Sequence, residues 1–295
     1  TASFFAEFFK QDELMFTDRD ISRSDRLGGI TGAGPGIFSS FGDPGTFIAF
    51  PDDPDADAVV IPAGNCSTQG GSGPGVQDGF CRFNRAEYRQ LVPEWEQYAA
   101  TARFERPGTD NMSFFSRATY FHSETATQLE PMAYDQGGTD GFGILTPVGV
   151  GSNPTSGADA LPGIWRRRLT EFGPRAEDVT NNTVNLLAGV RGELGDRYDW
   201  EFGVSYIEQR TVSINNGFVR KSDMNALIYG QDLDGDGIGD GGTLNLFNTI
   251  PQSLVDQLRI SPRGDGISSL GGADFQFSGD LFQFAGRTVK FASIL

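Results

Sequence analysis

The sequence predicts an all-β protein: an antiparallel, up-and-down segment of a transmembrane β-barrel, with about seven strands, an incomplete barrel and long extracellular loops. Polar and apolar residues alternate over several strand-length segments, and short and long connections alternate along the chain. No apolar run approaches the ~18 residues of a membrane-spanning helix, whereas a barrel strand needs only about 10 residues. These observations exclude a helical membrane protein and favour a barrel.

The clearest alternation is in DWEFGVSYIEQR, residues 199–210. Successive side chains of a strand point to opposite faces, so the even-numbered residues form an aromatic and aliphatic face. The odd-numbered residues, such as Glu201, Ser205 and Gln209, form a face of small or polar side chains. Similar or strongly aromatic segments bring the candidate strands to about seven. In chain order they are 1–11, 97–105, 112–121, 184–194, 199–210, 273–283 and 287–295.

The connections between these segments are of two kinds. The tight turns are 107–110, 195–198 and 285–287, and the long connections are 23–88, 127–178 and 216–271. Long and short connections alternate strictly, and alternate connections of an antiparallel meander emerge at opposite ends of the sheet. We therefore expect all long loops at one end and all turns at the other, as in outer-membrane barrels.

In a barrel, the apolar faces of the strands meet lipid, and the opposite faces line a wet or plugged lumen. Trp200 follows the turn at 195–198, where an aromatic girdle at the membrane interface belongs. A half-buried strand of a soluble sandwich would alternate in the same way, but it would not explain the asymmetry of the loops. The residues predicted to face lipid are Tyr98, Phe104, Val184, Leu186, Val190, Trp200, Phe202, Val204, Tyr206, Phe275 and Phe277.

Several of these segments resemble a known family. WRRRLTEFGPR at 165–175 and NLLAGVRGELGDRYDWEFGVSY at 185–206 are similar to the middle of the barrel in proteobacterial TonB-dependent receptors. FCRFNRAEYRQLVPE at 80–94 and DFQFSGDLFQFAGRTVKFA at 274–292 are similar to flanking parts of the same barrels. The resemblance implies a barrel of about 22 strands with an N-terminal plug. It also implies import of a scarce ligand across the outer membrane of a Gram-negative bacterium, driven through TonB.

The chain departs from that family at its ends. It shows no plug domain and no TonB box, and it begins and ends within strand-like segments. We therefore expect residues 1–295 to be a partial barrel domain, an internal fragment of a receptor. The expected partners are outer-membrane lipid, the TonB complex through the N-terminal part that the fragment lacks, and a small-molecule ligand that the sequence does not identify.

One loop contains a calcium-loop pattern, DLDGDGIGD at 232–240. In that pattern, carboxylates at alternate positions and one backbone carbonyl coordinate the cation. The twelfth position is Thr243 in place of a bidentate Glu, so the site is incomplete or borrows a carboxylate; the alternative is a flexible acidic turn. No other cofactor is expected. The candidate ligands are Asp232, Asp234, Asp236, the carbonyl of Ile238, and Asp240 directly or through water.

The two cysteines, Cys66 and Cys81, lie in one Gly- and Ser-rich segment. A polar loop offers no core in which free thiols are shielded, so this placement predicts a disulfide formed in an oxidising compartment. Two unpaired thiols are the alternative.

Composition weighs against two classes of function. The net charge of -16 disfavours nucleic-acid binding, which requires clustered Lys and Arg. The single histidine, His122, gives little basis for a triad or a zinc site, so no enzymatic activity is expected. A girdle or lumen position suits its aromatic neighbours better.

Two further segments have open interpretations. The run at 165–168, WRRR, suits contact with a ligand or lipopolysaccharide, or an upper strand that extends beyond the membrane. The segment 251–260 predicts a short helix, capped by Ser253 or Gln252, with Leu254, Val255 and Leu258 on one side. We expect this side to pack on neighbouring loops; a groove that binds a partner is the alternative.

A second class of function remains open at this point. The chain could be a cell-surface adhesin or binding module, in which the strands form a soluble β-sandwich and the loop at 232–240 is a structural calcium site. Sequence upstream of Thr1 distinguishes the two classes. A plug domain and TonB box would indicate transport, whereas a repeated β-module would indicate adhesion.

Overall fold

Seven long strands form one antiparallel sheet in the computed structural model, which describes residues 1–25, 38–52, 55–64, 66, 75–109, 111–135, 145–149, 153–228, 230 and 241–295. The order of the strands in the sheet is also their order in the chain. They are β1 (Ala2–Gln11), β8 (Glu94–Thr109), β9 (Met112–Pro131), β12 (Pro174–Leu194), β13 (Tyr198–Asn216), β16 (Arg263–Phe284) and β17 (Arg287–Ile294).

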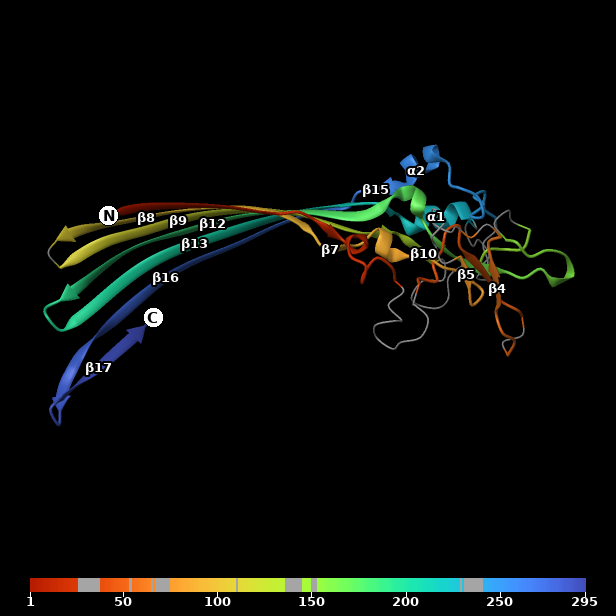
Figure 1. Ribbon diagram of the computed structural model, residues 1–295. Coiled ribbons are helices and arrows are strands. Elements are labelled where there is room, and N and C mark those ends of the chain that lie inside the picture. Colours follow the sequence, from red (N-terminus) through yellow and green to blue (C-terminus); the bar gives the residue numbers. More distant parts are fainter. Residues whose placement is uncertain are drawn as a thin grey trace.

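The connections in this sheet separate into two ends. Tight turns join β8 to β9, β12 to β13 and β16 to β17 at one end, on the left of Figure 1, and the long connections lie at the other end. The predicted up-and-down arrangement, with all long connections at one end, is therefore confirmed. The sheet is open, with β1 and β17 as its edge strands, so the described residues do not close a barrel.

Two of the tight turns use residues with positive φ. Gly195 has φ 63° between β12 and β13, and Ala285 and Gly286 have φ 50° and 76° between β16 and β17. Glycine adopts this left-handed conformation without the steric cost that a Cβ brings, which suits it to a tight strand reversal. The turn positions predicted at 195–198 and 285–287 agree with this geometry.

The strands extend further toward the long connections than predicted. β9 continues past 121 to Pro131, and β12 begins at Pro174, before the predicted start at 184. The added segments, such as HSETATQLE at 122–130, are polar on both faces and carry no apolar alternation. Continuous ladders with the neighbouring strands hold them in the sheet instead.

The long connections fold together into a lobe at the loop end of the sheet (Figure 1). Its centre is a four-stranded sheet in the order β10, β11, β3, β4, with bounds Ala133–Asp135, Gly163–Arg168, Thr46–Ala49 and Val59–Pro62. Smaller pairs are β2 (Leu14–Met15) with β7 (Gln90–Val92), β5 (Val76–Gln77) with β6 (Phe80–Cys81), and β14 (Phe218–Val219) with β15 (Arg259–Ile260). The described residues also form the short 3-10 turns η1 (Phe16–Asp18), η3 (Arg85–Glu87), η4 (Gly157–Asp159) and η5 (Thr170–Phe172).

The hydrophobic core of the described chain lies in this lobe. Trp165 is fully buried and makes edge-to-face contacts with Phe47 at 5.6 Å and Phe247 at 4.5 Å between ring centroids. These three rings come from different long connections, so the core ties the connections to one another. The buried core residues are Phe47, Ala49, Tyr134, Trp165, Leu169, Phe172, Val219, Met224, Ile228, Leu244, Leu246, Ile250, Val255 and Leu258.

Two short helices complete the lobe, α1 (Lys221–Ile228) and α2 (Gln252–Leu258). The helix predicted at 251–260 is confirmed, and Val255 and Leu258 are buried in the core. The predicted cap was wrong, because Pro251 occupies the N-cap position without a side-chain hydrogen bond, and Gln252 and Ser253 lie inside the helix. Among the described residues, no helix is both long and apolar enough to cross a membrane.

Candidate functional site

The residues predicted to face lipid all lie on one face of the seven-stranded sheet. Directly paired residues of adjacent strands project from the same face. Phe202 of β13 pairs with Val190 of β12 and with Phe275 of β16, and the ladders extend this relation to β9, β8 and β1. We call this surface the apolar face. Its predicted members are Tyr98, Phe104, Val184, Leu186, Val190, Trp200, Phe202, Val204, Tyr206, Phe275 and Phe277.

A band without charged residues crosses the apolar face on all seven described strands. On β8 it lies between Glu96 and Arg106, and on β13 it ends toward the loops at Glu208. Every apolar-face position between these limits is aromatic, aliphatic, small or a neutral polar residue. These positions are the first residue and every second residue after it in the ranges 2–8, 98–104, 112–120, 184–194, 198–206, 267–279 and 289–293.

The opposite face carries charges at the same height along the strands. Arg103 of β8 lies directly opposite Arg117 of β9, and Arg191 of β12 pairs with Glu201 of β13. Arg191 also forms an ion pair with Glu105. We call this surface the charged face, although large apolar side chains are interspersed on it. They include Phe5, Phe9, Trp95, Phe115, Phe121, Leu187, Ile207 and Leu270.

Nothing in the described chain covers the centre of the apolar face. Phe202, Val204 and Tyr206 keep 42%, 45% and 42% of their surface exposed, although they lie in the middle of the sheet. A sandwich would bury such residues beneath a second layer. The described residues place no second sheet there, and the lobe lies beyond the end of these strands (Figure 1).

Tyrosines mark the edge of the band that is nearer the loops. The hydroxyl of Tyr206 donates to Glu208 at 2.6 Å, the hydroxyl of Tyr120 donates to Asn182 Oδ1 at 2.9 Å, and the hydroxyl of Tyr98 donates to Glu96. Each acceptor lies further toward the loop end than its tyrosine. The rings therefore border the apolar band while the hydroxyls reach the polar region beyond it.

His122 occupies the apolar face just beyond this edge. Its Nδ1 lies 2.8 Å from Asn182 Oδ1, and its ring centroid lies 6.0 Å from that of Tyr98. His122 therefore lies on the apolar face and not on the opposite one, and its place in an aromatic girdle stays a prediction.

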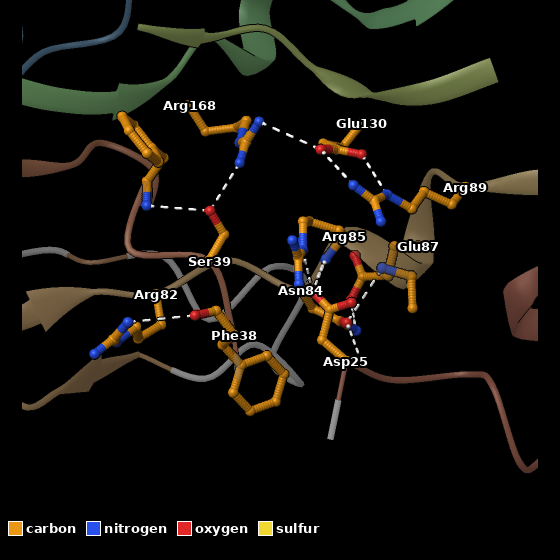
Figure 2. Close-up of polar contacts among 12 residues, drawn as sticks. Asp25, Phe38, Ser39, Arg82, Asn84, Arg85, Glu87, Arg89, Glu130 and Arg168 are labelled. Carbon is orange, nitrogen blue, oxygen red and sulfur yellow. Dashed lines mark hydrogen bonds and ion pairs between the residues drawn. The ribbon is translucent and has the colours of Figure 1, made fainter. Parts of the chain in front are cut away.

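A buried cluster of charged residues joins the lobe to the sheet (Figure 2). Glu130, near the end of β9, has a side chain only 5% exposed and receives hydrogen bonds from Arg89 at 2.6 and 3.0 Å. Arg175, at the start of β12, approaches the same carboxylate at 3.3 Å, and Arg168 of β11 lies 3.8 Å away. We call these four residues the joint cluster. It links two strands of the large sheet to the small sheet of the lobe.

Arg168 is the most deeply buried cation of the joint cluster. Its guanidinium donates to the carbonyl of Pro131 at 2.8 Å and to Ser39 Oγ at 2.8 Å, and it lies over the rings of Phe41 and Phe83. Burial lowers the pKa of Arg168 to about 10, against the opposing charge of Glu130. The guanidinium therefore stays protonated at neutral pH.

Glu130 is held in its charged form. Burial by itself raises the pKa of this carboxyl, but the hydrogen bonds from Arg89 and the charges of Arg89 and Arg168 outweigh burial. The pKa of Glu130 therefore lies below its ordinary value. The same contact raises the pKa of Arg89. The joint cluster is thus an ionised network at neutral pH.

Both interpretations of the run at 165–168 were wrong for three of its four residues. Trp165, Arg167 and Arg168 lie in β11 and are buried, so these three do not extend a barrel strand or present an outer contact surface. Arg167 donates to the carbonyls of Leu246 at 2.6 Å and Asn248 at 2.9 Å. It also pairs with Glu171 and with Asp43. Sequence patterns place charged residues at the surface, so GIWRRR carries no local signal of a buried strand.

The predicted disulfide is present. Cys66 and Cys81 are bonded with Cα atoms 5.5 Å apart, and the described residues contain no free cysteine. It closes a loop beside β3, where the amide of Cys81 donates to Thr46 Oγ1 at 2.9 Å.

The calcium prediction stays a prediction. Asp232, Asp234, Asp236, Ile238 and Asp240 lie outside the described residues. Within the part of the chain that the structure describes, no group of three or more His, Cys, Asp or Glu side chains is arranged to hold a metal ion.

Comparison with known proteins adds no assignment: no protein-family model matches the chain, and no curated protein is similar to it.

Proposed function

We propose that this chain forms part of the barrel wall of an outer-membrane transporter of the TonB-dependent kind, which captures a scarce small molecule and imports it. The observation that carries the proposal is the charge-free band on one face of the sheet, set against a charged face at the same height. In this proposal the apolar face contacts lipid, and the charged face lines the interior of the barrel.

The distribution of charge supports lipid as the solvent of the apolar face. A Lys or Arg on the lipid side of a barrel costs about 2–4 kcal/mol at the bilayer midplane, so such positions stay uncharged. The charge-free band crosses all seven described strands of the open sheet, and exposed apolar patches above a few hundred Å² are rare on soluble monomers. Phe202, Val204 and Tyr206 lie within this band and are exposed.

The tight turns at one end of the sheet and the long connections at the other support an orientation with the turns in the periplasm and the long connections outside the cell. Outer-membrane barrels have short periplasmic turns and long extracellular loops. The lobe, with its core and its disulfide, would then lie outside the cell, where disulfides persist. Ligand capture by the lobe, energy transfer through TonB and location in a Gram-negative outer membrane follow from the sequence resemblance. That the protein is not an enzyme is proposed from its single histidine, His122. Calcium bound at 232–240 would stabilise an outer loop.

The adhesin alternative is less well supported by the sheet. A soluble sandwich also keeps charge off its inner face, but it gives no reason for tight turns at one end of the sheet and long connections at the other. We therefore keep transport as the proposed function.

Paired arginine substitutions test the lipid-facing assignment. Val204 and Ser205 are adjacent and both exposed, but they point to opposite faces. In the full-length protein, Val204→Arg should cost about 2–4 kcal/mol and reduce the amount assembled in the outer membrane, whereas Ser205→Arg should be tolerated. Heat-modifiable mobility of outer-membrane fractions on gels measures the folded amount. Equal tolerance at the two positions would contradict the proposed function.

A further inference from the structure

The aromatic residues of the apolar face are arranged in two parallel rows. Three tyrosines, Tyr98, Tyr120 and Tyr206, form the row nearer the loops, which we call the tyrosine row. Each has an aromatic partner six positions along its own strand toward the turns. The partners form the turn-side row: Phe104 on β8, Phe114 on β9 and Trp200 on β13.

Both rows cross the strands obliquely. Tyr206 is level with Leu186 of β12, whereas Tyr98 is level with Asn182 through its pairing with His122. The tyrosine row thus shifts by four residues (186 − 182) over three strand spacings. At ~3.4 Å per residue and ~4.8 Å per strand, this shift is about 13 Å along the strands for about 14 Å across them. The slope is about 40°, which matches the ~35–45° tilt of strands in membrane barrels.

The distance between the charged residues that bound the apolar band supports a bilayer between the two rows. On β8, the apolar face is uncharged between Glu96 and Arg106. These residues are ten positions apart, or about 34 Å along the strand, which corresponds to about 26 Å of height at a ~40° tilt. The apolar band of an outer-membrane barrel is ~25 Å tall. The slope comes from the tyrosines and the length from the charged residues of β8, and the height that the two give together agrees with one membrane plane.

The strands continue well beyond the tyrosine row. β13 runs to Asn216 and β9 to Pro131. On the apolar face of this extension, Arg210 forms an ion pair with Asp265 at 2.8 Å. Such charged side chains favour water over hydrocarbon. The ten residues of β13 after Tyr206 add about 26 Å of height at the same tilt.

We propose that the outer boundary of the bilayer runs along the tyrosine row, where lipid headgroups contact the tyrosine hydroxyls. Tyrosine suits this level because its ring is apolar and its hydroxyl is polar. The upper parts of the strands then stand in water and hold the lobe clear of the bilayer. This inference rests on the proposed function and adds to it the height at which the membrane meets the wall.

A depth series on β13 tests the boundary. Single cysteines replace Val204, Val212 or Ile214 in the full-length protein with no other free thiol, and a nitroxide is attached after reconstitution into phosphatidylethanolamine and phosphatidylglycerol vesicles. All three residues are apolar, and all lie on the apolar face. Collision rates with oxygen, which concentrates in lipid, and with a water-soluble nickel chelate report the surroundings of each label.

Because all three replaced residues are apolar, we expect the labels to differ only by their height along β13. The label at 204 should collide mainly with oxygen, and the labels at 212 and 214 mainly with nickel. Oxygen-dominated collisions at 212 and 214 as well as at 204 would overturn the boundary and leave the proposed function standing. Nickel-dominated collisions at 204 would overturn the proposed function itself.

Discussion

Glu130 shows how much of the lobe's attachment depends on a single carboxylate. It lies among three arginines, and one of these, Arg168, is as deeply buried as Glu130. Buried ion pairs cost desolvation free energy when they form, but removing one partner leaves the other charge without compensation. The joint cluster is therefore sensitive to changes that a surface pair would tolerate.

Replacing Glu130 with glutamine should destabilise the lobe by about 3 kcal/mol, the lower end of the range for breaking a buried pair, because Arg89 and Arg175 reach solvent. Native-state proteolysis of the lobe in increasing urea measures this change in the full-length protein. Glu94→Gln is the matched control, since the exposed pair of Glu94 with Lys10 contributes at most ~1 kcal/mol. Equal effects of the two substitutions would contradict the role of the joint cluster.

The same carboxylate makes a prediction about pH. The pKa of Glu130 is lowered in the folded protein, so the stability it contributes is present above its unfolded pKa of ~4.3 and is lost as pH falls through the folded value. Protease resistance of the lobe should therefore hold from neutral pH down to about pH 4.5 and decline below that. The decline should be shallower in Glu130→Gln. An unchanged acid profile in the variant would show that other carboxylates govern it.

At the scale of elements, the sequence was informative wherever one face of a strand is apolar. Alternation at 199–210 and the glycine turn at Gly195 were sufficient to locate β12, β13 and their connection. The strand extensions beyond 121 and before 184 lacked this signal, because both of their faces are polar. Their pairing depends on neighbouring strands that the local sequence does not report.

The lobe was missed for a different reason. β3 is a run of four fully or nearly fully buried residues, TFIA, which is too short to show a period. β11 contains buried arginines, which a sequence pattern places at the surface. Both strands are stabilised by contacts between separate long connections, such as Trp165 with Phe247. Such contacts are tertiary, and no local pattern predicts them.

For the whole molecule, the proposed function depends on the difference between the two faces of one open sheet, one free of charge across its central band and the other charged. The sequence predicted which residues share the apolar face, because alternation and the short turns determine strand register. It did not predict the two oblique rows of aromatic residues, since these depend on the stagger between strands. Contact of the apolar face with lipid is the central claim.

A cysteine scan of residues 199–208 in bilayers tests that claim most directly. Each position carries a nitroxide in turn, and collision rates with oxygen and with a water-soluble nickel chelate are compared along β13. The account predicts a period of two, with oxygen dominating at 200, 202, 204 and 206 and nickel dominating at 201, 203, 205 and 207. A profile without this alternation, or one with nickel dominating at the even positions, would contradict it.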